Sequence, residues 1–161
     1  MTQTLWETES DFIRLMARVK DRGIKINVPF SRAKAIQGTS ILNRIQDELG
    51  WNPGSPQQIG KYLIDELGLP VLKRTPKGDP SFDKEALNDY ELYLSATGDA
   101  TAQKVLEYRG WQKTVSSNYQ AYLELMDENE ILHPNYKVHG TRTARLSCEK
   151  PNLQQIPRSN P

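Results

Sequence analysis

Two short segments near the carboxyl end of the chain decide the fold: H-G-T-R-T-A-R-L-S at residues 139–147 and P-N-L-Q-Q-I-P at residues 151–157. Between Ile131 and Pro161 the sequence has no helical period, and Gly, Pro and polar residues separate short apolar pieces. This pattern predicts short strands joined by tight loops. Five basic residues against one acid lie between Tyr136 and Pro161. The segment therefore carries a local positive charge that attracts phosphates, unless these cations only solvate the surface.

The sequence before residue 131 is helical in pattern. Apolar residues recur at helical spacing, and Gly or Pro marks the places where helices end or begin. Ser55 followed by Pro56 is typical of a helix start, and Gly23 is expected to supply a left-handed turn at a helix end. The predicted elements are helices at Leu5 to Val19, Pro29 to Leu49, Pro56 to Leu67, Asp83 to Leu94 and Ala102 to Met126, with a short extended piece at Ile24 to Val28.

The composition limits the classes of protein to consider. A chain of 161 residues can form one ordinary domain, or one domain with part of another. No apolar run approaches the ~20 residues that span a bilayer, so no membrane association is expected. The amino-terminal stretch lacks the pattern of a signal peptide. The single cysteine, Cys148, excludes an internal disulfide framework and fits a reducing, cytoplasmic compartment.

The two quoted segments resemble the palm signature of family A DNA polymerases. That signature reads T-x-T-G-R-L-S-S, a short spacer and P-N-L-Q-N-I-P. Four further stretches resemble the thumb of the same family and the helix that joins its thumb to its palm. They are R-G-I-K-I at residues 22–26, Asn52 to Leu69 with Ser55 and Gln58, L-K-R-T-P-K-G at 72–78, and L-E-Y-R-G-W-Q-K at 106–113. The resemblance covers nearly the whole chain, in order.

The resemblance implies an α+β fold, mainly α, with an elongated helical thumb followed by the short strands of an incomplete palm. Residues 1–128 would form the thumb, with its tip at about residues 50–95 and its long connecting helix at about residues 102–126. Residues 129–161 would form the N-terminal portion of the palm, truncated. The location implied is the cytoplasm of a bacterial cell or of a phage-infected host.

The resemblance also implies that primer–template DNA is the partner. Such a partner is gripped through its phosphates, without reading the base sequence. Arg145 would reach a minor-groove acceptor near the primer end, because that acceptor has nearly the same position in every correct base pair. Arg109 and Lys113, one helical turn apart, would face the duplex backbone, and Ser55 at a helix start would contact a phosphate. The implied DNA-binding residues are Arg145, Asn152, Gln154, Arg109, Lys113, Ser55 and Thr143.

These residues also have purely structural interpretations. The alternatives are a pair of Arg145 with Glu149, a capping role alone for Ser55, and a pair of Arg109 with Glu107 or Asp99. The loop cations Lys73, Arg74 and Lys77 are expected only to solvate their loop. Cys148 is expected to be a small buried residue.

Three residues depart from the family pattern: Ala144 stands where glycine is usual, Cys148 where serine is common, and Gln155 where asparagine is common. A methyl group at Ala144 puts the fit of a closely approaching ligand in doubt. The first metal-binding carboxylate of the family lies in a D-Y-S-Q-x-E-x-R motif that is not among the 161 residues. The complete enzyme implies Mg²⁺, but this chain is expected to bind no cofactor and to have no catalytic residues of its own.

Three functions are compatible with this sequence. The chain could be the primer–template binding part of a DNA polymerase whose remaining palm and fingers are a second polypeptide, acting in replication or repair. It could be an inactive truncated product, or a non-enzymatic DNA-binding module. All three predict that the chain alone is inactive. A coiled-coil or scaffold role leaves the motifs at Arg145 and Asn152 unexplained.

Overall fold

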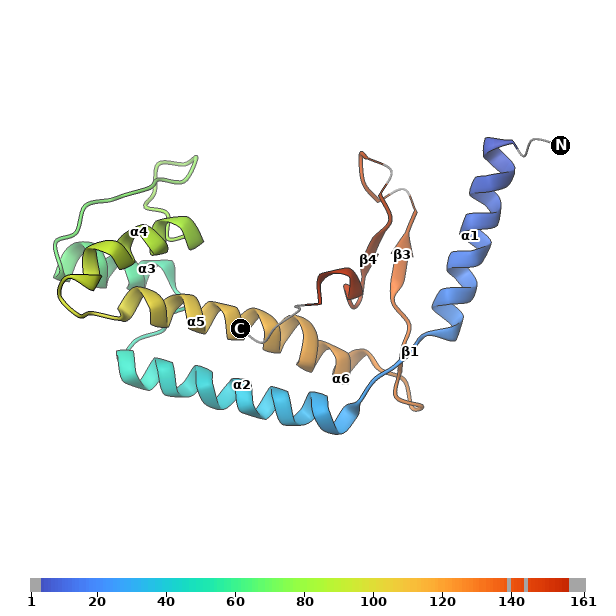
Figure 1. Cartoon of the computed structure of the whole chain (residues 1–161), viewed down its shortest axis with the longest axis horizontal. Helices are drawn as coiled ribbons and strands as arrows, with labels where there is room; N and C mark the ends of the chain where they lie inside the picture. The colour runs from blue at the N-terminus through green and yellow to red at the C-terminus, as the bar shows by residue number, and fades with distance from the viewer. Residues whose placement is uncertain (1–3, 139, 144, 157–161) are drawn as a thin grey trace. The chain divides into compact units, whose positions relative to one another are not determined.

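The computed structural model describes residues 4–138, 140–143 and 145–156 and confirms a mainly helical α+β fold (Figure 1). Ala144, where the family pattern has glycine, lies outside the described residues. The α-helices are α1 (Leu5–Arg22), α2 (Val28–Leu49), α3 (Pro56–Gly60), α4 (Lys84–Ser95), α5 (Thr101–Thr114) and α6 (Ala121–Leu125). The strands are β1 (Ile24–Lys25), β2 (Ile131–Leu132), β3 (Asn135–Lys137) and β4 (Ser147–Glu149). Two π-helical segments, η1 (Lys61–Glu66) and η2 (Val115–Gln120), and a 3₁₀ turn, η3 (Leu153–Gln155), complete the described elements.

The chain forms two compact units. One comprises the residues up to Ile36 together with those from Thr114 onward, and the other runs from Gln37 to Lys113. We call them the terminal unit and the central unit. The predicted division into a thumb at residues 1–128 and a palm from residue 129 concerns function, and it stays a prediction.

In the terminal unit, helix α1 begins and ends at the signals that its sequence carries. The Thr4 hydroxyl accepts the Glu7 N–H while the Glu7 carboxylate accepts the Thr4 N–H, which is a capping box. Gly23 ends the helix with φ 63° and ψ −169°. The positive φ was predicted, but this ψ is extended rather than left-handed helical, so the chain passes directly from α1 into β1.

Two small antiparallel ladders complete the terminal unit. Strand β1 pairs with β2, with Ile24 opposite Leu132. Strand β3 pairs with β4, with Tyr136 opposite Cys148, and α1 contacts β3. The Cys148 side chain is buried, as predicted, and its thiol donates to the Pro151 carbonyl over 3.3 Å.

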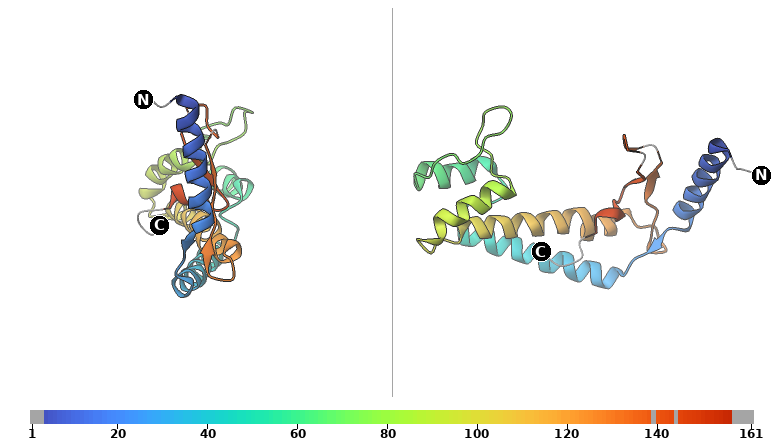
Figure 2. Two further views of the ribbon diagram at one scale, coloured as in Figure 1. Left: turned by 90° about the vertical axis from the view of Figure 1, so that its right-hand side faces the viewer. Right: turned by 45° about the horizontal axis from the view of Figure 1, so that its top comes forward.

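The central unit has its own hydrophobic core between α3–η1, α4 and α5. The buried side chains of this core are Ile59, Leu63, Phe82, Leu87, Tyr90, Leu94, Ala102 and Val105. Ser55 caps α3 and Pro56 occupies its first turn, as the sequence predicted. Asp83 caps α4 by accepting the Ala86 N–H over 3.0 Å. Between η1 and α4 the chain forms a long loop, residues 67–83 (Figure 2). Within this loop, Arg74 and Pro80 form an antiparallel bridge.

The longest predicted helix differs from its prediction in one respect. The helical run from Thr101 to Leu125 switches to π-type hydrogen bonding over η2 before it continues as α6. The spacing of apolar residues does not distinguish a π-helix from an α-helix over so short a segment, because in both kinds of helix residues one turn apart lie on the same side. The same applies to η1, which extends α3.

Candidate nucleic-acid interface

The turn at Asn52–Ser55 is closed by its own side chains. Asn52 Oδ1 accepts the Gly54 N–H over 2.8 Å, and the Asn52 carbonyl accepts the Ser55 N–H over 3.0 Å. Gln58 reaches back from α3, where its Oε1 accepts the Asn52 N–H over 2.6 Å. The Ser55 hydroxyl accepts the Gln58 N–H over 3.5 Å. The N-x-x-S-x-x-Q pattern is therefore a locked helix start, and the side chains of Asn52 and Gln58 have structural roles that the sequence motif alone did not assign.

Gly54 brings this turn against helix α5. A Cβ atom at Gly54 would lie 3.4 Å from Tyr108 Cε1 and 3.5 Å from Gln112 Nε2. Tyr108 directly precedes Arg109 in the sequence, and Gln112 directly precedes Lys113. The locked turn therefore lies close to the basic part of α5, which carries Arg109 and Lys113.

Arg109 is half-buried in this neighbourhood. Its Nη1 donates to the carbonyl of Phe82, at the end of the long loop before α4. Desolvation lowers the pKa of Arg109, and the nearby charge of Asp83 opposes that effect. Neither of the predicted alternatives is the partner seen: Glu107 pairs with Arg44 over 3.6 Å, and Asp99 accepts the Tyr62 hydroxyl over 3.0 Å.

Lys113 lies one turn farther along α5 and is exposed. The i, i+4 spacing predicted for Arg109 and Lys113 is therefore present on a continuous α-helix. The two side chains differ in burial, because Arg109 is held against the Phe82 loop while Lys113 reaches solvent.

Two cations of the long loop, Lys73 and Arg74, have partners in the loop and at the start of α4. Lys73 Nζ lies 2.7 Å from Asp83 and 2.6 Å from Glu85, and these carboxylates raise the pKa of Lys73. Arg74 Nη1 donates to the Gly78 carbonyl over 2.7 Å. Both contacts shape the loop, which agrees with a structural interpretation of these charges.

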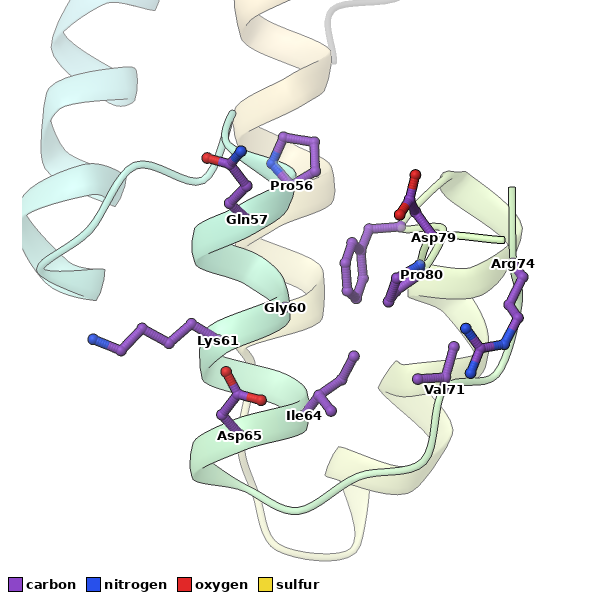
Figure 3. Close-up of a pocket in the computed structure, with 11 residues that line it drawn as sticks. Pro56, Gln57, Gly60, Lys61, Ile64, Asp65, Val71, Arg74, Asp79 and Pro80 are labelled. Atoms are coloured by element: carbon purple, nitrogen blue, oxygen red, sulfur yellow. The ribbon is translucent and has the colours of Figure 1, made fainter. Parts of the chain in front are cut away.

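A cavity of about 680 Å³ separates this loop from α3 and η1 (Figure 3). Its lining is mixed: the apolar side chains of Ile64, Val71 and Pro80 point into it, whereas the Lys61 ammonium points away. Arg74 and the carboxylates of Asp65 and Asp79 complete the charged part of the lining. The absence of a side chain at Gly60 lets the Phe82 ring pack against α3, since a Cβ atom there would lie 3.3 Å from the ring. The two carboxylates in this lining would repel a phosphate, so the cavity is not part of the candidate interface.

In the terminal unit, Arg145 stands at the end of a turn that Thr141 closes. The Thr141 hydroxyl donates to the Arg145 carbonyl over 2.9 Å and accepts the Arg145 N–H over 2.8 Å. The side chains of Arg145 and Thr143 are exposed. Thr141 thereby fixes the backbone from which the Arg145 guanidinium projects, a positioning role that the motif did not reveal.

Glu149, the alternative partner of Arg145, is engaged with strand β3. Its Oε2 lies 2.6 Å from Lys137 Nζ, and its Oε1 accepts the Asn135 amide over 3.2 Å. The Lys137 ammonium, with the Asn135 amide, lowers the pKa of Glu149. This carboxylate therefore stabilises the β3–β4 ladder across the strands.

Asn152 and Gln154 follow on the other side of β4, and both are exposed. Asn152 Oδ1 accepts the Gln154 N–H over 3.1 Å and so caps η3. Gln154 Nε2 donates to the Leu146 carbonyl over 3.1 Å, which ties the second motif back to the first. Each bond uses one part of an amide that carries two N–H donors and one carbonyl, so these roles leave capacity for a further partner.

No helix in the described ranges has the length and apolar composition needed to cross a membrane. Among the described residues, no group of three or more His, Cys, Asp and Glu side chains is arranged to hold a metal ion.

Comparison with known proteins identifies the family. Residues 31–161 match the family described as DNA polymerase family A. The chain is 30% identical to DNA polymerase I of Helicobacter pylori strain J99, over 96% of this chain and 17% of that protein. It is 32% identical to the DNA polymerase of Escherichia phage T5, over 89% of this chain and 18% of that protein. The chain thus spans less than a fifth of either relative.

A solved structure supports the same assignment. The polymerase domain of Pol1 from M. smegmatis, in complex with DNA primer–template and dNTP, superposes on 91% of this chain with a TM-score of 0.77 and 25% identity. This chain corresponds to 26% of that one. The matched segment includes both of the motifs that carry Arg145 and Asn152, and the chain therefore belongs to DNA polymerase family A.

Proposed function

We propose that this chain is the part of a family A DNA polymerase that holds the primer–template duplex. The observation that carries the proposal is the likeness to a polymerase domain whose structure contains primer–template DNA. Two features support it: the exposed Arg145 on a turn held by Thr141, and the locked helix start at Ser55 beside the basic part of α5. Phosphate contacts from such groups grip duplex of any sequence.

Arg109 and Lys113 would serve this grip in different ways. A guanidinium carries five N–H donors, and the Phe82 carbonyl takes one of them. Arg109 can therefore fix the loop before α4 and still present donors to a phosphate. Lys113, which is exposed, would contribute its charge. Removing Arg109 should consequently lower both stability and DNA affinity, and removing Lys113 should lower DNA affinity.

DNA binding by the purified chain tests this proposal. We expect a dissociation constant on the order of 10⁻⁴ to 10⁻⁶ M at physiological salt, independent of sequence, measured by fluorescence anisotropy with a labelled primer–template. Lys113→Ala and Arg109→Ala should each weaken binding to all sequences alike and reduce the salt slope by about one. Arg109→Ala should in addition lower the urea midpoint of the central unit.

Lys84→Ala is the matched control, because it removes one exposed charge from the same unit at a position outside the proposed interface. Its affinity and salt slope should equal those of the wild type. A flat salt dependence, or no binding at tens of micromolar protein in low salt, would contradict the proposal and favour an inactive product.

Arg145→Ala should change DNA binding by the isolated chain little. In an enzyme completed with the rest of a polymerase domain, it should impair extension from matched primer ends and discrimination against mismatched ends.

We further propose that these 161 residues need a second part, in the same or another polypeptide, for catalysis. The family resemblance assigns the metal-binding carboxylates to a motif outside them. The purified chain should incorporate no nucleotide in a primer-extension assay with Mg²⁺. Extension activity that stays with the protein through successive purification steps would refute this proposal and leave the DNA-binding proposal to its own test.

A further inference from the structure

His133 lies between strands β2 and β3, and its imidazole meets two acceptors from different parts of the terminal unit. Its Nδ1 is 2.7 Å from the carbonyl oxygen of Lys20, in the last turn of α1. Its Nε2 is 3.3 Å from Oδ2 of Asp127, in the turn that precedes β2. The contact with Lys20 joins residues that are 113 positions apart in the sequence.

Both partners can only accept a hydrogen bond. A backbone carbonyl has no proton to give, and the Asp127 carboxylate remains ionised because the Ile131 N–H bond, the His133 ring and the Asn129 N–H lower the pKa of Asp127. Each ring nitrogen must therefore carry a hydrogen for both bonds to form, and that species is the imidazolium ion. In a neutral ring, one nitrogen would turn a lone pair toward an acceptor.

The surroundings favour the charged ring. The Lys20 carbonyl is among the last four of α1, which have no partner within the helix and lie at the negative end of its dipole. Coulombic attraction from two carboxylates, Asp127 and Asp21, also favours the charged ring. Together with the Lys20 carbonyl, they raise the pKa of His133.

One side of the ring lies against the backbone of Gly23. A Cβ atom at Gly23 would lie 3.0 Å from His133 Cε1 and 2.6 Å from the Leu132 carbonyl oxygen. The bare backbone of Gly23 therefore lets the end of α1 and the β2–β3 connection approach closely enough for the imidazole to reach the Lys20 carbonyl.

We propose that His133 is a proton-dependent clasp, which fastens the end of α1 to the Asp127 turn when the imidazole carries two protons and loosens when it loses one. The chain that follows His133 continues into β3 and then into the β3–β4 hairpin, which carries Arg145. A link from the clasp to DNA binding would rest on the proposed function, but the clasp itself does not.

The sign of the pH dependence follows from the direction of the shift. Because the pKa of His133 is raised in the folded protein, the clasp stabilises fully below the unfolded-state pKa of about 6.5. Its contribution is lost as the pH rises through the higher folded-state value.

Two NMR measurements on the whole chain test the clasp without DNA. The His133 ring signal, assigned with a His133→Gln variant, should titrate above the pKa of about 6.5 of an unperturbed histidine, and Asp127→Asn should move its midpoint down. Amide protection at Gly23 to Ile26 should fall several-fold as the pH passes that midpoint, after correction for intrinsic exchange. In His133→Gln this extra fall should disappear.

A matched control is Glu128→Gln, which removes a neighbouring exposed charge from the same turn and should leave both readouts unchanged. If His133→Gln fails to fold, the wild-type and Asp127→Asn titrations still decide. A His133 midpoint at or below 6.5, or a midpoint that Asp127→Asn does not move, would overturn the proposal.

Discussion

Replacing Gly23 by alanine should lower the free energy of unfolding by about 3–5 kcal/mol, the range of severe backbone and packing defects. Two causes act together. The combination of φ 63° and ψ −169° lies in a region that only glycine adopts readily. The added Cβ atom would also overlap Ile131 Cγ2 and lie 2.6 Å from the Leu132 carbonyl oxygen, in the strand that pairs with β1. The β1–β2 ladder would have to separate to admit the methyl group.

Gly50→Ala is the control for this substitution. Gly50 also has a positive φ, 73°, but nothing lies within 4 Å of the position of its Cβ atom. Its substitution should therefore cost only the conformational strain, about 1 kcal/mol. Urea unfolding followed by circular dichroism compares the two variants. Equal midpoints would mean that the close approach at Gly23 does not hold the terminal unit together.

Tyr90→Ala should lower the free energy of unfolding of the central unit by about 3–5 kcal/mol, as for other large aromatic truncations in a core. Tyr90 is almost completely buried, and its ring stacks on Phe82 with centroids 6.1 Å apart. Its hydroxyl donates to the Pro70 carbonyl over 2.9 Å and accepts the Leu72 N–H over 3.4 Å. The side chain therefore fastens both ends of the long loop to α4.

Tyr90→Phe separates these contributions. It keeps the ring but leaves the Pro70 and Leu72 groups without the hydroxyl, so we expect a loss of about 1–3 kcal/mol. Tyr93→Ala, on the same helix and 53% exposed, should change stability by less than about 0.5 kcal/mol beyond its helix propensity. The measurement is urea unfolding followed by Trp51 fluorescence, since Trp51 packs against Tyr62 with ring centroids 5.7 Å apart. A Tyr90→Ala midpoint close to that of Tyr93→Ala would contradict the assignment of Tyr90 to the core.

The sequence predicted those parts of the fold that local chemistry determines. Ser55 caps its helix, as predicted, because a short polar side chain can reach an N–H group of its own first turn. Gly23 ends α1 because only glycine accepts its backbone angles there. Apolar periodicity located the helices, but it could not distinguish the π-helical segments η1 and η2 from α-helix.

The sequence did not predict the long-range partners. The Arg109 guanidinium finds the Phe82 carbonyl 27 residues away, and His133 finds the Lys20 carbonyl 113 residues away. Backbone carbonyls are present in every residue, so no pattern of side chains marks the one that a given cation will meet. For Arg109 the sequence suggested the nearby carboxylates Glu107 and Asp99 as partners, but these bind Arg44 and Tyr62. The DNA-binding roles of Arg145, Asn152 and the other interface residues stay predictions.

Helix α1 has a consequence for how this chain behaves in concentrated solution. Within α1, all of which the structure describes, no residue is buried, and Leu5 and Trp6 are 76% and 77% exposed. Exposed apolar side chains on one element make a surface that attracts other apolar surfaces. That attraction strengthens in sulfate and phosphate salts, which are excluded from protein surfaces. We therefore expect the exposed apolar side chains of α1 to contribute to self-association of the chain, whose net charge of +1 gives little electrostatic repulsion.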